Sequence, residues 1–138
     1  MELTPAQVDA FVSAEYPAVH QGGFRCESVT DGSAAARWTH DPSTLRPGGL
    51  ISGPVQFTAA DLALWYLSFT IVGLQPMAVT SDLSISFLRP ASGADLLATA
   101  HLLRAGRTRI VGRVDLWVDG DERLVSHATG SYAVLGGP

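Results

Sequence analysis

Two segments in the first half of the chain carry apolar residues at helical spacing. The first follows the capping pair Thr4-Pro5 and stops at Pro17, which predicts a short amphipathic helix within residues 1–20. The second, residues 54–72, is apolar on nearly every side and lies between Ser52-Gly53-Pro54 and Gly73. Because Ser or Gly can cap a helix and Pro suits its first position, we expect a long central helix there, buried on most of its circumference.

Outside the two predicted helices, apolar and polar positions alternate along the chain, as they do in half-buried strands. Residues 24–30 and 34–40 flank the turn Asp31-Gly32 and predict a hairpin. Residues 78–135 carry the main antiparallel strands, which we expect as a four-strand meander. A curved antiparallel sheet wrapped around the apolar helix covers it most economically, so the prediction is an α+β hotdog fold in a single domain, residues 1–138.

The composition of the chain limits which cellular compartment and which binding partners we expect. With 46% hydrophobic and 16% charged residues, the chain has apolar surface to spare for a subunit interface or an apolar ligand pocket. The single Cys26 forms no internal disulfide, and the N-terminus lacks a secretory pattern, so we expect a cytoplasmic protein. A net charge of −4 argues against nucleic acid as a partner. The apolar stretch 55–79 resembles a membrane span, but it contains Asp61 and Pro76 and has no basic flank, so we expect no membrane partner.

Asp61 is the charged residue that stands alone in the apolar helix. No other Asp, Glu, Lys or Arg occurs between Arg46 and Asp82. A carboxylate in such surroundings loses solvation, and residues in apolar clefts with perturbed charge are candidates for catalysis. The structural alternative is that Asp61 bonds Thr58 or a neighbouring chain, or points to solvent.

The turn that enters the central helix offers a site for negative charge. Helix N-termini present unpaired N–H groups and a partial positive charge, which suits a developing oxyanion. Pro54 has no N–H, so Gly53 is the candidate donor, although Gly-Pro before a helix is often only a cap. Because Asp61 is on the same helix, we expect its carboxylate beside this amide end.

Three segments in matching order and spacing resemble the PaaI-type branch of the hotdog acyl-CoA thioesterases. They read Gly-Pro-Val-Gln-Phe-Thr-Ala-Ala-Asp over 53–61, Val-Thr-Ser-Asp-Leu-Ser-Ile-Ser-Phe-Leu-Arg-Pro-Ala over 79–91, and Ala-Gly-Arg-Thr over 105–108. The similarity covers roughly residues 46–135. It implies hydrolysis of an acyl-CoA thioester by a homodimer or a dimer of dimers.

The resemblance also assigns roles to residues. Asp61 matches the family's general base or nucleophile, Gly53 the amide that binds the thioester oxygen, and Thr80 a hydroxyl that holds water in some members. Because such sites form between subunits, Asp61 and Thr80 are expected to meet across the dimer. Two features depart from the family: Ser52 and Pro54 replace a His and a second Gly, and Arg46 replaces an Asn.

Arginines are candidates for the phosphates of CoA, since Arg pairs with phosphate through two parallel hydrogen bonds. Arg89 falls at a strand end, and Arg107 and Arg109 flank a turn. Solvated strand-edge charges are the ordinary alternative for each. CoA is part of the substrate, so no separate cofactor is expected, and the four histidines form no metal-binding pattern.

Two other functions remain open. A non-catalytic acyl-CoA or lipid-binding hotdog module would bind the thioester without cleaving it. A hydratase of the same fold expects a His working with the Asp, and the central helix contains no His.

Overall fold

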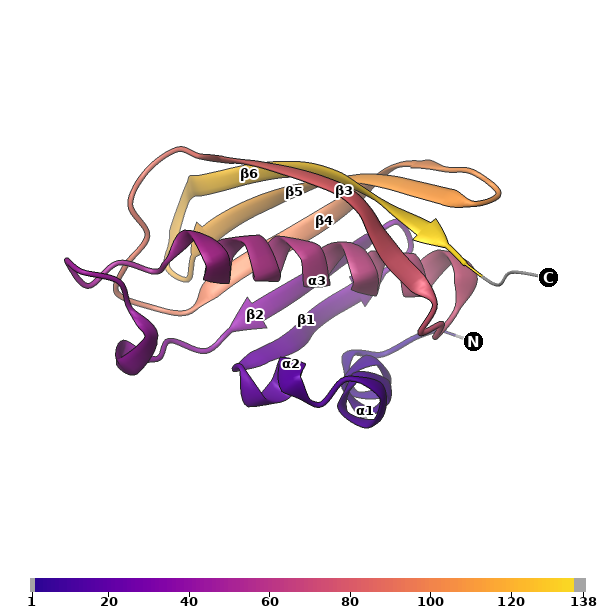
Figure 1. Cartoon of the computed structure of the whole chain (residues 1–138), viewed down its shortest axis with the longest axis horizontal. Helices are drawn as coiled ribbons and strands as arrows, with labels where there is room; N and C mark the ends of the chain where they lie inside the picture. Colours follow the sequence, from indigo (N-terminus) through magenta and orange to yellow (C-terminus); the bar gives the residue numbers. More distant parts are fainter. Residues whose placement is uncertain (1, 136–138) are drawn as a thin grey trace.

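The computed structural model describes residues 2–135, and its centre is one long helix inside a curved sheet (Figure 1). Helix α3 (Gly53–Val72) begins at the cap Ser52 and ends at Gly73, whose φ of 83° favours glycine. Ahead of it lie α1 (Pro5–Glu15), α2 (Ala18–Gln21) and a 3₁₀ turn (Pro42–Thr44). The strands are β1 (Phe24–Thr30), β2 (Ser33–Trp38), β3 (Ala78–Phe87), β4 (Leu96–Ala105), β5 (Arg109–Val118) and β6 (Asp121–Val134). The α+β hotdog prediction is confirmed.

The helix boundaries agree with the caps in the sequence. Thr4 accepts from the Gln7 N–H while the Gln7 side chain accepts from the Thr4 N–H, a reciprocal capping box that starts α1. Pro17 ends that helix as expected, but the chain then forms the additional turn α2. Four residues are too few to show apolar periodicity, so this helix was not predicted.

The strand order differs from the expected meander. All neighbours are antiparallel, in the order β1-β2-β4-β5-β6-β3, so of the four expected meander strands only β4, β5 and β6 follow one another. Strand β3 pairs with β6 at one edge of the sheet, while β4 pairs with β2. Alternation marks which residues face the helix but does not select a neighbour, and the chain here departs from the usual pairing of consecutive strands.

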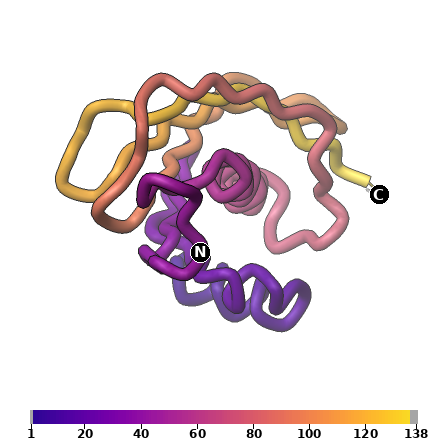
Figure 2. The backbone as a smooth tube through the Cα atoms, turned by 60° about the vertical axis from the view of Figure 1, so that its left-hand side comes forward, coloured from indigo at the N-terminus to yellow at the C-terminus, as the bar shows by residue number. Residues whose placement is uncertain are grey.

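The sheet curls around α3 and leaves one side of the helix uncovered by strands (Figure 2). Its concave face carries small residues under the helix, so large α3 side chains such as Leu64 and Leu67 fit between backbone and helix. Helix α3 is long and apolar enough to span a membrane, yet 61% of the residues in its apolar stretch are buried inside the domain. The fold therefore uses it as a core helix.

Gly130 of β6 is packed tightly against both strand β3 and helix α3. A Cβ at this position would lie 2.8 Å from the Asp82 backbone oxygen and 2.9 Å from Leu64 Cδ1. Because the backbone cannot move aside cheaply, we expect Gly130→Ala to lower the free energy of unfolding by about 1–3 kcal/mol. Denaturant titration measures this, with Gly106→Ala as control, since a Cβ there meets only an oxygen at 3.4 Å. Equal losses in both variants would contradict the tight fit.

Candidate active site

Asp61 lies on α3 where the helix faces β3 and β6, and its side chain is partly buried. Its Oδ1 accepts a hydrogen bond from Thr80 Oγ1 at 2.6 Å and another from Tyr132 Oη at 2.7 Å. Tyr132 Oη also lies 3.0 Å from the Asp61 backbone oxygen. Asp61 and Thr80 therefore meet within one chain, not across a dimer as expected, and the bond to Thr58 does not form among the described residues.

The register of two strands brings these hydroxyls together. Thr80 on β3 is directly opposite Tyr132 on β6, so both side chains point to the concave face and reach the same carboxylate oxygen. A β-bulge follows immediately, between Thr80 and Asp82, and it pairs Asp82 with Ser131. Consecutive residues point to opposite faces, so Asp82 is turned to the convex side, where Ser131 Oγ donates to it. The bulge keeps a second carboxylate away from Asp61.

Tyr132 is a site residue that the sequence did not reveal. It is 5% exposed, and burial, followed by the neighbouring Asp61 charge, raises its pKa well above the ordinary range. The phenol therefore stays protonated at neutral pH and donates to the carboxylate. An aromatic residue at a core-facing strand position ordinarily indicates packing, and the hydroxyl contact follows only from the pairing of β6 with β3.

The beginning of α3 presents a free amide. Ser52 caps the helix by accepting from the Val55 N–H at 3.2 Å, and Pro54 has no N–H. Within residues 2–135, the Gly53 N–H has no hydrogen-bond acceptor. The Phe87 ring lies over Gly53, because a Cβ there would be 3.2 Å from Phe87 Cζ. A thioester oxygen at this amide would also lie in the positive field of the helix end.

Asp61 and the Gly53 amide are farther apart in one chain than we expected. They are separated by eight residues of continuous helix, which is about 12 Å at 1.5 Å per residue. In one active site, the amide donates to the carbonyl oxygen, water attacks the carbonyl carbon, and the carboxylate accepts a hydrogen bond from that water. This arrangement places the amide nitrogen and the carboxylate oxygen roughly 9 Å apart at most. Within one chain, Asp61 therefore lies about two helical turns from the amide end.

The two family departures occupy structural positions. The Ser52 hydroxyl is engaged in the helix cap. Arg46 is exposed in a turn, where its backbone N–H donates to the Leu50 carbonyl and its Nε lies 3.4 Å from the Pro47 carbonyl oxygen. Neither side chain has a hydrogen bond to Asp61 within the described residues.

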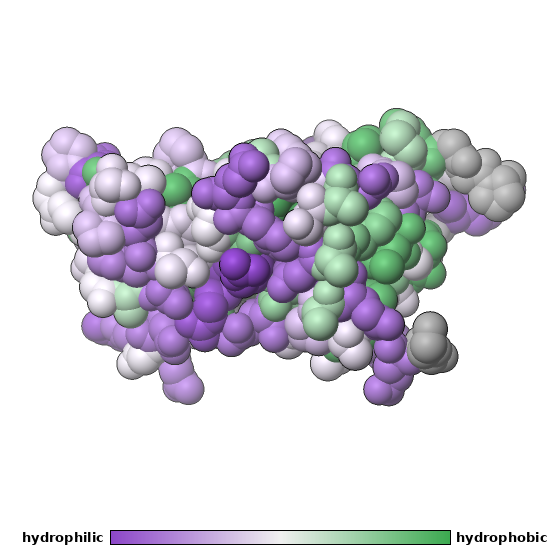
Figure 3. Space-filling view, turned by 90° about the horizontal axis from the view of Figure 1, so that it is seen from below, coloured by the Kyte–Doolittle hydropathy of each residue, from purple (hydrophilic) through white to green (hydrophobic). Residues whose placement is uncertain are grey.

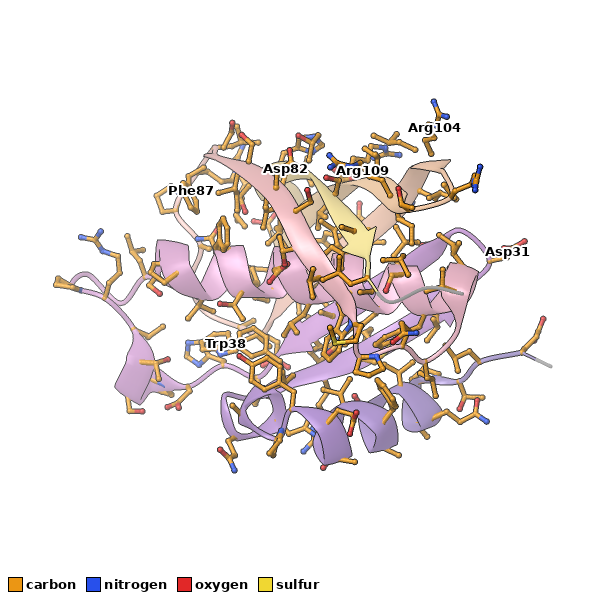
Figure 4. All side chains as sticks on the ribbon, turned by 45° about the vertical axis from the view of Figure 1, so that its right-hand side comes forward. Asp31, Trp38, Asp82, Phe87, Arg104 and Arg109 are labelled. Atoms are coloured by element: carbon orange, nitrogen blue, oxygen red, sulfur yellow. The ribbon has the colours of Figure 1, made fainter. Side chains whose placement is uncertain are left out.

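The candidate phosphate-binding arginines divide into two groups. Arg107 and Arg109 line a surface depression at the β4–β5 turn together with Arg104, and none of the three pairs with a described carboxylate. Arg89 lies beyond the opposite end of β3, where its Nε donates to the Leu124 carbonyl. Figure 4 shows Arg104 and Arg109 far from Phe87, which precedes Arg89 closely in the chain. The β6 partners of Arg109 and Phe87, Ala133 and Ser126, are about 23 Å apart.

Two other kinds of catalytic site, a metal centre and a cysteine nucleophile, find no support among the described residues. Among the described residues, no group of three or more His, Cys, Asp or Glu is arranged to hold a metal ion. Cys26 is buried, and burial together with the charge of Asp9 raises the pKa of its thiol to about 12. The thiol is therefore protonated at neutral pH and is a poor nucleophile.

Comparison with known proteins gives consistent results. A family model described as the thioesterase superfamily matches residues 48–125. A candidate thioesterase from Silicibacter sp. TM1040 superposes with a TM-score of 0.86 and 34% identity over 96% of this chain and 94% of that chain. The Escherichia coli PaaI protein from the phenylacetic acid degradation operon has a TM-score of 0.80 and 23% identity over 98% of both chains, which is a likeness of fold. The medium/long-chain acyl-CoA thioesterase YigI of Salmonella typhimurium is 42% identical over 55 residues, 40% of this chain and 35% of that protein.

Proposed function

The chain belongs to the thioesterase superfamily, and we propose that it is a PaaI-type hotdog enzyme that hydrolyses an acyl-CoA thioester to the free acid and CoA with Asp61 as the catalytic group. Membership of the family makes the protein a thioester hydrolase. The observation that carries the assignment of Asp61 is its geometry. One carboxylate oxygen is held by Thr80 and Tyr132, while no described residue donates to Oδ2.

The proposed reaction uses Asp61 as general base or as nucleophile. In the general-base form, Oδ2 takes a proton from water as the water oxygen attacks the carbonyl carbon. The carbonyl oxygen becomes negative and accepts from the Gly53 N–H. The C–S bond then breaks, and the CoA thiolate takes the proton held by Asp61 and leaves as thiol, which restores the carboxylate. In the nucleophilic form, the carboxylate attacks the carbonyl carbon, and the C–S bond breaks to release CoA and leave an anhydride. Water then cleaves the anhydride to the free acid and the Asp61 carboxylate.

We propose that each active site combines Asp61 of one subunit with Gly53 of another. The separation along α3 supports this, because the two groups are too far apart to act on one thioester within a chain. A homodimer, alone or paired as a dimer of dimers, supplies both groups. Thr80 belongs to the Asp61 half of the site, and while its hydroxyl donates to the carboxylate its oxygen can still accept a hydrogen bond from water.

Strand β3 is the proposed contact between subunits. It is the sheet edge beside which neither α1 nor α2 packs, because both lie beside β1 at the other edge. Large apolar side chains are exposed on and around β3: Val72, Leu74, Met77, Val79, Phe87 and Leu88. Figure 3 shows an apolar area, towards the end of the molecule where the termini lie, on an otherwise mostly polar face. A second copy of the chain would cover this surface.

The basic turn is the proposed site for the phosphates of CoA. Arg107 and Arg109 converge there without carboxylate partners among the described residues, so their charge is free for an anion. Arg89 lies too far away to join them in one chain and would contact CoA only from another subunit. We propose a cytoplasmic enzyme that needs no cofactor besides the CoA of its substrate.

One experiment separates hydrolysis from binding alone. A non-catalytic acyl-CoA or lipid-binding module is the alternative, because neither Ser52 nor Arg46 takes over the role of the family's His and Asn. We expect the purified protein to release free thiol from members of an acyl-CoA panel of increasing chain length, with saturation kinetics. Light scattering on the same sample should give two or four times the chain mass of 14.6 kDa. Saturable binding without thiol release from any member would establish the binding module instead.

A further inference from the structure

The two hydroxyl groups that donate to Asp61 Oδ1 differ in their exposure to water. Thr80 is exposed on the edge strand, so solvent competes for its hydroxyl. Tyr132 is 5% exposed and its hydroxyl sits between the backbone oxygen and the carboxylate of Asp61. The hydrogen bond from Tyr132 of β6 is therefore the contact to this carboxylate with which water does not compete.

Resting on the proposed function, we propose that Tyr132 is a positioning residue that holds Asp61 Oδ1 so that Oδ2 faces the substrate. A carboxylate can rotate about its Cβ–Cγ bond and exchange its two oxygens, which is a broad torsion. Two donors on Oδ1 at 2.6 and 2.7 Å oppose that exchange. The remaining oxygen then keeps its lone pairs for the proton of the attacking water or for the acyl carbon.

A tyrosine suits position 132 because of its length and its terminal hydroxyl. The Tyr132 ring comes from the sheet across the concave face, and its length brings the hydroxyl to the helix backbone as well as to the side chain. The same hydroxyl therefore orients the carboxylate relative to the helix. Its pKa is raised, mainly by burial, so it remains a donor across the working pH range and does not itself act as the base.

Tyr132→Phe tests this inference, because it removes the hydroxyl and keeps the ring. We expect kcat to fall about tenfold, as for one lost hydrogen bond to a charged group, with KM changed less than twofold.

A double variant separates positioning from a structural effect. In an Asp61→Asn background, adding Tyr132→Phe should not lower the residual rate further, because Tyr132 acts through the carboxylate. A Tyr132→Phe enzyme with the parent kcat would overturn the inference, as would a rate that falls equally in both backgrounds. Either result leaves the proposed function standing if Asp61→Asn alone is inactive, whereas an active Asp61→Asn variant would refute that function.

Discussion

Asp61→Asn is expected to lower kcat for acyl-CoA hydrolysis by about 10²–10⁴-fold, the usual contribution of a positioned acid or base. The amide that replaces the carboxylate cannot take a proton from water and is not a nucleophile for a thioester. KM should change little, because the proposed role of Asp61 is at the reacting centre and the proposed contacts to CoA are made by other residues. Free-thiol release at saturating substrate measures the loss.

The Asn variant is a clean test because it can keep the contacts of the parent. The Asn Oδ1 accepts from Thr80 and Tyr132 as the carboxylate oxygen does, so the fold should be preserved. Asp61→Ala is the contrasting variant. It leaves the buried Tyr132 hydroxyl without its side-chain acceptor and should cost about 1–3 kcal/mol of stability in addition. Unfolding curves therefore distinguish the two, and hydrolysis by Asp61→Asn at the parent rate would remove Asp61 from the mechanism.

Local signals in the sequence were sufficient for the helices α1 and α3 and for most strands. The caps Thr4 and Ser52 and the terminating Gly73 define helix ends through their own hydrogen bonds or dihedral angles. The hairpin around Asp31-Gly32 is likewise set by a glycine, at φ 80°. These features depend on neighbours in the chain, so they could be predicted without any knowledge of tertiary structure.

Features that depend on strand order could not be predicted in the same way. The alternation of β3 fits either a meander or the observed edge position beside β6. Because Tyr132 reaches Asp61 only through that pairing, its role was hidden as well. The bulge after Thr80 carries no sequence signal that we recognise, yet it decides that Thr80 rather than Asp82 shares the concave face with Tyr132. Asp61 itself was predictable because a charge in an apolar helix is costly.

Gly53→Pro is expected to lower kcat by about 10²–10³-fold, because it removes the amide that would hold the thioester oxygen. The backbone accepts the change: Ser52 already has φ −69° and ψ 156°, the extended conformation that a following proline requires. Proline is also tolerated in the first turn of a helix. Gly53→Ala is the matched control, since it retains the N–H and brings the same Cβ towards Phe87. Equal losses in both variants would show that crowding by the side chain matters and the amide does not.

Mixing the two inactive variants then tests whether the site is shared between subunits. Asp61→Asn and Gly53→Pro chains are refolded together so that their subunits redistribute at random. If Asp61 of one subunit works with Gly53 of the other, each mixed dimer contains one site with both groups intact. Half of the dimers are mixed, so about a quarter of the parent activity should return. If both groups acted within one chain, no site in the mixture would be complete and activity would stay at the level of the separate variants. The 12 Å of helix between them, at about 1.5 Å per residue, is the physical reason to expect recovery.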